Sequence, residues 1–233
     1  MPRQLSVVLP SLATLSSLVF GVLAIMVLAD GEFFLAAMLI MLGSILDVLD
    51  GQLAARLDAV SDLGKELDSL ADVVTFGVAP TILIYHLLLI EGVDRHIAIL
   101  SSLAFVMAGA FRLARFNTMP SDRNAAFKGM PIPMGSALLI TASFWQHWVI
   151  NIWWTAAVVT VSFLMISAFP YPKSKQVLAL PPLAWGSVAL FGLSCWLIAG
   201  WQAVPFSLFF LYGLSGPLLS VYRSARRRLI SLV

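Results

Sequence analysis

Repeated apolar segments of about 20 residues are the feature that most restricts what this chain can fold into. A helix of that length crosses the ~30 Å hydrocarbon layer of a membrane. Hydrophobic residues make up 60% of the 233 residues and charged residues only 11%, whereas a soluble domain carries about 25% charged residues. The segments are too long for the strands of a membrane barrel and lack their alternation. We therefore expect an all-α, polytopic bundle of membrane helices.

Eight membrane-spanning helices are predicted from these segments. They lie near residues 7–28, 33–56, 62–90, 96–116, 132–150, 153–169, 180–199 and 203–222. With this arrangement, 13 of the 14 basic residues fall on the side of the two termini, and only Arg95 falls on the other side. Because Lys and Arg are enriched in cytoplasmic loops, we expect a multi-pass cell-membrane protein with both termini in the cytoplasm.

Acidic side chains are concentrated in one predicted helical hairpin, residues 46–77, which contains seven of the chain's 12 acidic residues. Asp47 and Asp50 are three residues apart on the second helix, and Asp68 and Asp72 are four apart on the third. Each pair therefore shares one helix face. Measured from the cytoplasmic turn, the inner acid on each helix lies at roughly 13 Å and the outer acid at roughly 18–20 Å. The four carboxylates can therefore converge.

Such a cluster is unstable in a region of low dielectric constant unless cations or protons relieve the repulsion. Hard carboxylate oxygens suit Mg²⁺ or Mn²⁺, and Ca²⁺ is a further possibility. Gly51 and Gly64 lie toward the turn from the acids, where their missing side chains would let a ligand approach the helices closely. We favour a divalent-metal site over aspartates that merely face water.

An ion-coupled transporter that uses the intramembrane aspartates is an alternative from a different class. Transporters are expected to spread such carboxylates along a path near the membrane midplane, often with broken helices. A lipid-binding or scaffold protein that retains a metal site is a third reading. The sequence places its acids in one hairpin toward one side, which favours an enzyme.

The spacing of these acids and glycines resembles the signature of the CDP-alcohol phosphotransferase family, DxxDGxxARx8GxxxDxxxD. In this chain it reads Asp47-x-x-Asp50-Gly51-x-x-Ala54, then Gly64-x-x-x-Asp68-x-x-x-Asp72. The family's arginine would fall at Ala55, whereas this chain has Arg56 one position later. A shift of one position turns a helical side chain by about 100°. All the acid and glycine spacings match.

This resemblance implies an enzyme that transfers a phosphatidyl-type group from a CDP-activated lipid to an alcohol and releases CMP. It implies that Asp47, Asp50, Asp68 and Asp72 bind divalent metal and that Asp72 is the general base. The implied CDP-binding residues are Thr14, Asp50, Gly51, Arg56, Gly64, Asp68 and Ser69, with Thr75 as a weaker candidate. A homodimer is also implied by the resemblance alone.

A second segment, Gly109 to Gly135, concerns the acceptor alcohol. Its "RLARFN" and "FKGMPIP" resemble the membrane-integral branch of the family that uses L-serine, the phosphatidylserine synthases. We expect Arg112, Arg115 and Lys128 to hold the carboxylate of L-serine or the lipid phosphate, since arginine binds such groups with two parallel hydrogen bonds. Anchoring of anionic lipid headgroups is an alternative role for these cations. Glycerol 3-phosphate or an inositol phosphate is an alternative acceptor.

We expect the whole chain, residues 1–233, to form a single membrane-embedded catalytic domain. The resemblance covers about residues 1–175, which would be the catalytic core, and the last two helices, about 180–222, would complete the bundle or a dimer surface. Expected partners are the CDP-activated lipid (CDP-diacylglycerol or CDP-archaeol), L-serine and membrane lipids, and no nucleic acid.

Overall fold

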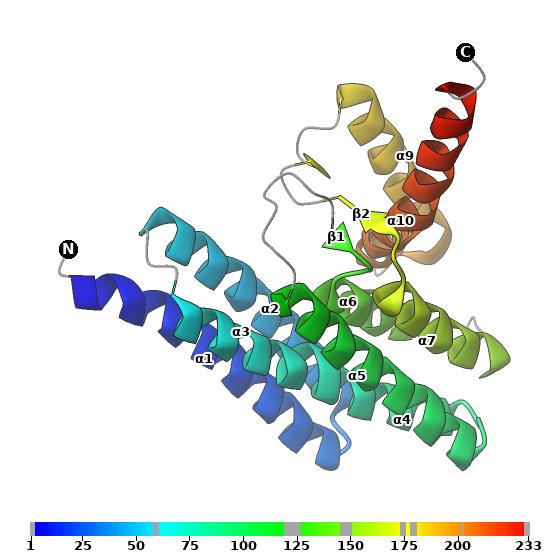
Figure 1. Ribbon diagram of the computed structural model, residues 1–233. Helices are drawn as coiled ribbons and strands as arrows, with labels where there is room; N and C mark the ends of the chain where they lie inside the picture. Colours follow the sequence, from blue (N-terminus) through cyan, green and yellow to red (C-terminus); the bar gives the residue numbers. More distant parts are fainter. Residues whose placement is uncertain are drawn as a thin grey trace.

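The computed structural model describes residues 3–57, 61–118, 127–144, 151–172, 176–177, 181–201 and 203–230 of the chain. Most of these residues are helical (Figure 1). The elements are α1 (Arg3–Ala29), α2 (Phe33–Arg56), α3 (Asp62–Asp72), the π-helix η1 (Val73–Val78), α4 (Ala79–Ile90), α5 (Arg95–Thr118), β1 (Phe127–Lys128), α6 (Ile132–Ser143), α7 (Asn151–Ile166), β2 (Pro170–Tyr171), α9 (Pro182–Ala199) and α10 (Ala203–Ile230).

The expected all-α, multi-pass membrane bundle is confirmed by the described helices. Five of them are long and apolar enough to cross a membrane, and three shorter apolar helices lie within the other predicted spans. These eight segments coincide with the eight predicted from the sequence, and the number of actual crossings stays a prediction. The far end of the predicted span 132–150 and the hairpin turn at 58–60 lie outside the described residues.

The predicted third span is one continuous helical segment, Asp62–Ile90, whose middle is wound as a π-helix. The backbone N–H of Ala79 donates to the carbonyl of Val74, five residues earlier. Pro80 follows at once, and a proline ring collides with the carbonyl four residues earlier in a regular α-helix. A widened π-turn relieves such a collision. This turn begins directly after Asp72. It therefore sets the rotation of α3, which carries Asp68 and Asp72, relative to α4.

Close packing of small residues holds α1, α2 and η1 together beside the acidic hairpin. The Thr75 hydroxyl donates to the carbonyl of Ser17 at 3.1 Å, and the Ser17 hydroxyl donates to the carbonyl of Gly43 at 3.1 Å. A Cβ atom at Gly21 would lie 2.6 Å from Thr75 Oγ1, and one at Gly43 would lie 2.7 Å from Thr75 Cγ2. Thr75 is fully buried. It therefore serves packing between helices and does not line a ligand pocket.

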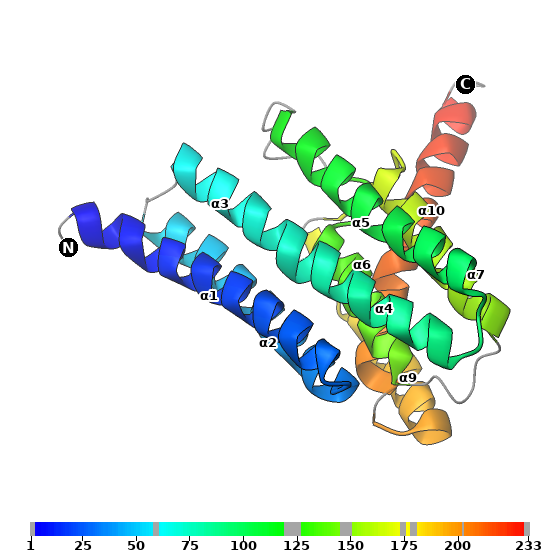
Figure 2. The same cartoon turned by 90° about the horizontal axis from the view of Figure 1, so that it is seen from below.

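The last helix joins the bundle through α6 and the short strands. β1 and β2 pair antiparallel, with Phe127 opposite Tyr171 and Lys128 opposite Pro170. In both views α10 lies across the bundle from α1 and α2, and it packs on α6, α9 and β2 (Figures 1 and 2). The β1–β2 pair thus joins the segment after α5 to the segment after α7, and α10 packs against β2.

Candidate active site

Carboxylates of the acidic hairpin converge between α2 and α3. One oxygen each from Asp47, Asp50 and Asp68 lies within 4.8 Å of the others. The convergence follows from the helical spacing, since the two helices run antiparallel from a common turn and carry their acids at matching distances from it. Three hard oxygen donors this close together form a set that can hold a divalent metal ion, and the all-carboxylate composition suits Mg²⁺, Mn²⁺ or Ca²⁺.

Asp72 lies one turn deeper than Asp68 and is 9% exposed. Its side chain is within hydrogen-bonding reach of Asp47. Its Oδ1 atom is buried and has no hydrogen-bond partner among the described residues. A buried carboxylate oxygen without a partner is costly in a folded protein. Asp72 therefore has an oxygen available to a ligand, a metal or a proton at the deep end of the cluster.

Asp50 is held from the neighbouring helix by Thr14. Thr14 Oγ1 lies 2.5 Å from Asp50 Oδ2 and 3.1 Å from the carbonyl oxygen of Pro10. A hydroxyl has one proton to donate, and the shorter contact is to the charged acceptor. Both side chains are about 95% buried, at 5% exposure each. This contact fixes the carboxylate of Asp50 at the edge of the cluster.

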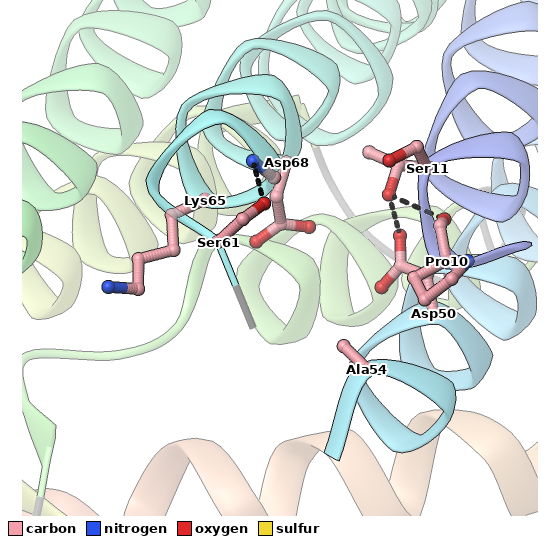
Figure 3. A pocket seen from close by; sticks show the side chains of 10 residues that line it. Pro10, Ser11, Asp50, Ala54, Ser61, Lys65 and Asp68 are labelled. Atoms are coloured by element: carbon pink, nitrogen blue, oxygen red, sulfur yellow. Dashed lines mark hydrogen bonds between the residues drawn. The ribbon is translucent and has the colours of Figure 1, made fainter. Parts of the chain in front are cut away.

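A pocket of about 210 Å³ opens beside these carboxylates. Figure 3 shows Asp68 and Ser61 on one side of it, facing Asp50, Pro10 and Ser11 on the other. Its full lining comes from α1, α2 and the start of α3: Pro10, Ser11, Thr14, Asp50, Gly51, Ala54, Ser61, Gly64, Lys65 and Asp68.

The two signature glycines lie in this lining. Among the described residues, a Cβ atom added at Gly51 would meet no other atom within 4 Å, and one at Gly64 would meet only Ser61 Oγ, at 3.1 Å. Packing within the protein therefore does not explain the glycine at position 51. Close approach of a ligand does explain it, because a side chain there would project into the pocket.

Five of the seven predicted CDP-binding residues line the pocket, and Arg56 and Ser69 do not. Arg56 is exposed at the last turn of α2. The Ser69 hydroxyl donates to the carbonyl of Lys65 at 3.0 Å and accepts a 2.9 Å hydrogen bond from Asn117 of α5. The structure thus turns Ser69 toward α5, a direction that spacing alone does not predict.

Sequence reasoning missed several pocket residues, including Lys65 and Ser11. In Figure 3 the side chain of Lys65 points away from Asp50 and Asp68. Its Nζ lies 3.0 Å from Oδ1 of Asp62. Ser61 caps the start of α3, since its Oγ accepts a hydrogen bond from the backbone N–H of Gly64 at 3.1 Å. Ser61 and Lys65 are four residues apart and therefore face the same side at the start of α3. This spacing could have placed both in the pocket lining.

The three predicted acceptor-binding cations have different surroundings. Arg112 is 6% exposed, and its guanidinium carbon lies 5.8 Å from the centre of the Phe116 ring. It is close enough to Asp72 for the two charges to interact. Lys128 is exposed on β1. Arg112 is thus the member of the group that the fold brings to the deep end of the acidic cluster.

Arg115 forms a clamp of backbone hydrogen bonds. Its Nη1 donates to the carbonyl of Ile166 at 2.7 Å, and its Nη2 lies 2.8 Å from the carbonyl of Lys128, 3.1 Å from that of Ser167 and 3.3 Å from that of Met165. Gly129 makes this possible: its φ is +81°, and a Cβ there would lie 2.7 Å from Arg115 Nη2 and 2.2 Å from the Met165 carbonyl. The guanidinium is therefore used to fasten β1 to the end of α7.

Comparison with known proteins identifies the class to which this fold and site belong. A family model described as CDP-alcohol phosphatidyltransferase matches residues 7–211, and the chain belongs to that family. It is 38% identical over 168 residues to the CDP-diacylglycerol–serine O-phosphatidyltransferase of Bacillus subtilis, covering 72% of this chain and 92% of that one.

Two archaeal proteins show a similar likeness. A CDP-diacylglycerol–serine O-phosphatidyltransferase of Methanocaldococcus jannaschii is 37% identical, over 69% of this chain and 71% of that protein. An archaetidylserine synthase of Methanothermobacter thermautotrophicus is 36% identical, over 72% of this chain and 70% of that one. The resemblance read from the hairpin spacing is thereby confirmed.

Proposed function

We propose that this protein transfers a phosphatidyl-type group from a CDP-activated lipid to the hydroxyl of L-serine and releases CMP. The observation that carries the proposal is the position of Asp72, which lies beside the Asp47–Asp50–Asp68 cluster and within electrostatic range of Arg112. Its buried Oδ1 has no hydrogen-bond partner among the described residues. The names of the three similar proteins, each a serine transferase or an archaetidylserine synthase, support L-serine as the acceptor.

The CDP end of the lipid is assigned to the pocket between α1, α2 and α3. Thr14, Asp50, Gly51, Gly64 and Asp68 line it and are the CDP-binding residues of this proposal. Asp47, Asp50 and Asp68, with Asp72 at the deep end, would hold Mg²⁺ or Mn²⁺, with Ca²⁺ as a further candidate. A divalent metal bound there would neutralise charge on the pyrophosphate and on the departing CMP.

Asp72 is the general base. It takes the proton of the serine hydroxyl, whose oxygen then forms a bond to the phosphorus next to the lipid. The bond between that phosphorus and the bridging oxygen breaks, and CMP leaves with the electron pair. Arg112 holds the serine carboxylate, and Lys128, which is exposed on β1, is a second candidate cation for that carboxylate or the lipid phosphate. The pocket lies toward the hairpin turn, which the charge distribution assigns to the cytoplasm.

CMP release by the purified protein tests this function. The assay supplies CDP-diacylglycerol or CDP-archaeol, a divalent metal, and one acceptor at a time: L-serine, glycerol 3-phosphate or an inositol phosphate. We expect release that requires L-serine and metal. Release with a phosphorylated acceptor instead would support the transfer reaction at the acidic hairpin but would reject L-serine as the acceptor.

Asp72→Asn separates the base from a merely structural acid. We expect kcat to fall by about 10²–10⁴-fold while CDP-lipid binding persists. Asp62→Asn is the matched control, since Asp62 is an exposed acid of the same helix whose partner is Lys65. Unchanged turnover in Asp72→Asn would reject the assigned base, and loss of turnover in both variants would indicate a general effect of charge.

A single catalytic domain over residues 1–233 and a homodimer are also part of this proposal. Cross-linking of the protein in its native membrane, followed by mass measurement, tests the dimer. Membership of a transferase family removes the support for an ion-coupled transporter.

A further inference from the structure

The pocket assigned to CDP contains a cation that the proposed function does not use. Among the described residues that line it, Lys65 is the basic one, and Asp50 and Asp68 are the acids. Arg56, which was expected to bind CDP, is exposed at the last turn of α2 and lies outside the lining. The diphosphate of a CDP-activated lipid is negatively charged and is repelled by the two carboxylates. A basic side chain in the lining would offset that repulsion together with the metal.

Lys65 lies one helical turn from the nearer of these carboxylates. It is three residues before Asp68 on α3, about 4.5 Å along the helix axis. Side chains at this spacing are neighbours on one helix face, and both of these line the pocket. The flexible four-carbon stem of lysine spans such a separation. The ammonium of Lys65 can therefore reach a phosphate group that lies beside Asp68.

The partner of Lys65 in this structure is one that it can exchange easily. Its Nζ lies 3.0 Å from Oδ1 of Asp62, and the two side chains are 60% and 100% exposed. An ion pair so open to water contributes little to stability. Figure 3 shows the Lys65 side chain directed away from Asp50 and Asp68. Rotation of the lysine stem away from Asp62 is thus the movement that phosphate binding needs, and it costs little.

The start of α3 adds a second attraction for an anion at the same wall. The Oγ atom of Ser61 accepts a hydrogen bond from the backbone N–H of Gly64 at 3.1 Å, and both residues line the pocket. The positive end of the helix dipole therefore lies beside Lys65. Arg56 has the opposite surroundings, because it lies at the C-terminal end of α2, where the dipole is negative.

We propose that Lys65 binds the diphosphate of the CDP-activated lipid, a role for which the sequence pattern pointed to Arg56. The Lys65 ammonium leaves Asp62 and donates hydrogen bonds to phosphate oxygens in the pocket. Lys65 is then the basic residue of the CDP site, and Arg56 takes no part in it. This inference rests on the proposed function, since it assumes that CDP occupies this pocket.

Lys65→Gln in the full-length protein tests the inference by calorimetric titration with CDP in the presence of Mn²⁺. Glutamine favours a helix and Lys65 is exposed, so the variant should fold. Loss of a hydrogen bond between two charged groups corresponds to about a tenfold change in an equilibrium constant or more. We expect the Kd for CDP to rise by about tenfold or more, and KM for CDP-diacylglycerol to rise with it. We expect the unfolding temperature and KM for L-serine to stay the same.

Arg56→Gln is the matched control. It removes the same charge from the same hairpin, but from a side chain outside the pocket lining. A general attraction between the basic hairpin turn and CDP would make the two variants equally weak, whereas we expect the Kd of Arg56→Gln to stay within twofold. Lys65→Arg keeps the positive charge and should restore most of the CDP affinity, which a requirement for lysine packing would not allow.

A Kd for CDP in Lys65→Gln within twofold of the original, or an equal rise in Arg56→Gln, would overturn the inference. The unaltered protein shows which proposal fails. If it binds CDP and Lys65→Gln binds CDP equally well, only the role of Lys65 is rejected. If the unaltered protein does not bind CDP in the presence of Mn²⁺, the pocket is wrongly assigned, and the role of Lys65 is rejected with it.

Discussion

Thr14 on α1 and Asp50 on α2 are 36 residues apart in the sequence, and Oγ1 of the first lies 2.5 Å from Oδ2 of the second. The contact ties the first helix to the acidic hairpin at the wall of the pocket. It also holds the carboxylate of Asp50, which contributes an oxygen to the cluster with Asp47 and Asp68.

Thr14→Val removes this hydrogen bond and keeps the shape of the side chain. A hydrogen bond to a charged group contributes about 1.5–3 kcal/mol, so we expect KM for CDP-diacylglycerol to rise at least about tenfold. Ser16→Ala is the control, because Ser16 is exposed on the same helix and donates only to the carbonyl of Leu12. Steady-state kinetics in detergent measures both. Equal KM values for Thr14→Val and the unchanged protein would contradict a role of Thr14 in the CDP site.

Gly51→Ala tests whether the space at position 51 belongs to the substrate. No atom of the described residues that would crowd the added Cβ lies within 4 Å of it, so we expect the unfolding temperature to stay the same and CDP-lipid binding to weaken strongly. Gly43→Ala is the opposite case, since its Cβ would lie 2.7 Å from Thr75 Cγ2. Overpacking of this kind costs about 1–3 kcal/mol of stability. If Gly51→Ala bound CDP-lipid normally, the nucleotide would not approach α2 at this point.

Asp68→Asn tests the metal assignment. Replacing one charged oxygen of the Asp47–Asp50–Asp68 set weakens binding of a hard cation, and we expect the Mn²⁺ concentration for half-maximal activity to rise more than about tenfold. Chelation of metal should abolish turnover of the unchanged protein, and added Mg²⁺ or Mn²⁺ should restore it. Calorimetric titration with Mn²⁺ gives a readout that does not depend on activity. An unchanged Mn²⁺ affinity in Asp68→Asn would place the metal elsewhere.

Arg115→Lys distinguishes a clamp from an acceptor ligand. Lysine keeps the charge but cannot reach the carbonyls of Lys128, Ile166 and Ser167 together. We expect a loss of about 1–2 kcal/mol in stability, because three backbone carbonyls lose a charged donor, with KM for L-serine nearly unchanged. Arg223→Lys, at an exposed position of α10, is the control. A rise in KM for L-serine at full thermal stability would instead return Arg115 to the acceptor site.

The convergence of the acids could be predicted from the sequence because it depends on helical spacing within one hairpin. The distances of Asp50 and Asp68 from their shared turn are set by a constant rise per residue, and tertiary packing need only keep the two helices adjacent. The position of Gly51 beside these acids, in the lining of the pocket, could be predicted for the same reason.

The surroundings of Arg115, Ser69 and Tyr212 could not be predicted in this way. Arg115 meets carbonyls about 50 residues later in the chain, and Tyr212 meets Pro172, so both depend on how the chain between α5 and α10 folds back. Hydrophobic periodicity describes single helices and does not predict contacts between residues so far apart in the sequence. The π-turn after Asp72 is a further case, since it changes the direction of side chains within a span that reads as one uniform helix.

The most direct test of the central claim follows the serine oxygen. The protein is incubated with CDP-diacylglycerol, divalent metal and L-serine labelled with ¹⁸O in its side-chain hydroxyl. The masses of the products are then measured by mass spectrometry. Attack of that hydroxyl on the phosphorus next to the lipid predicts one labelled phosphatidylserine for each unlabelled CMP released. CMP formed without labelled phosphatidylserine would contradict the account.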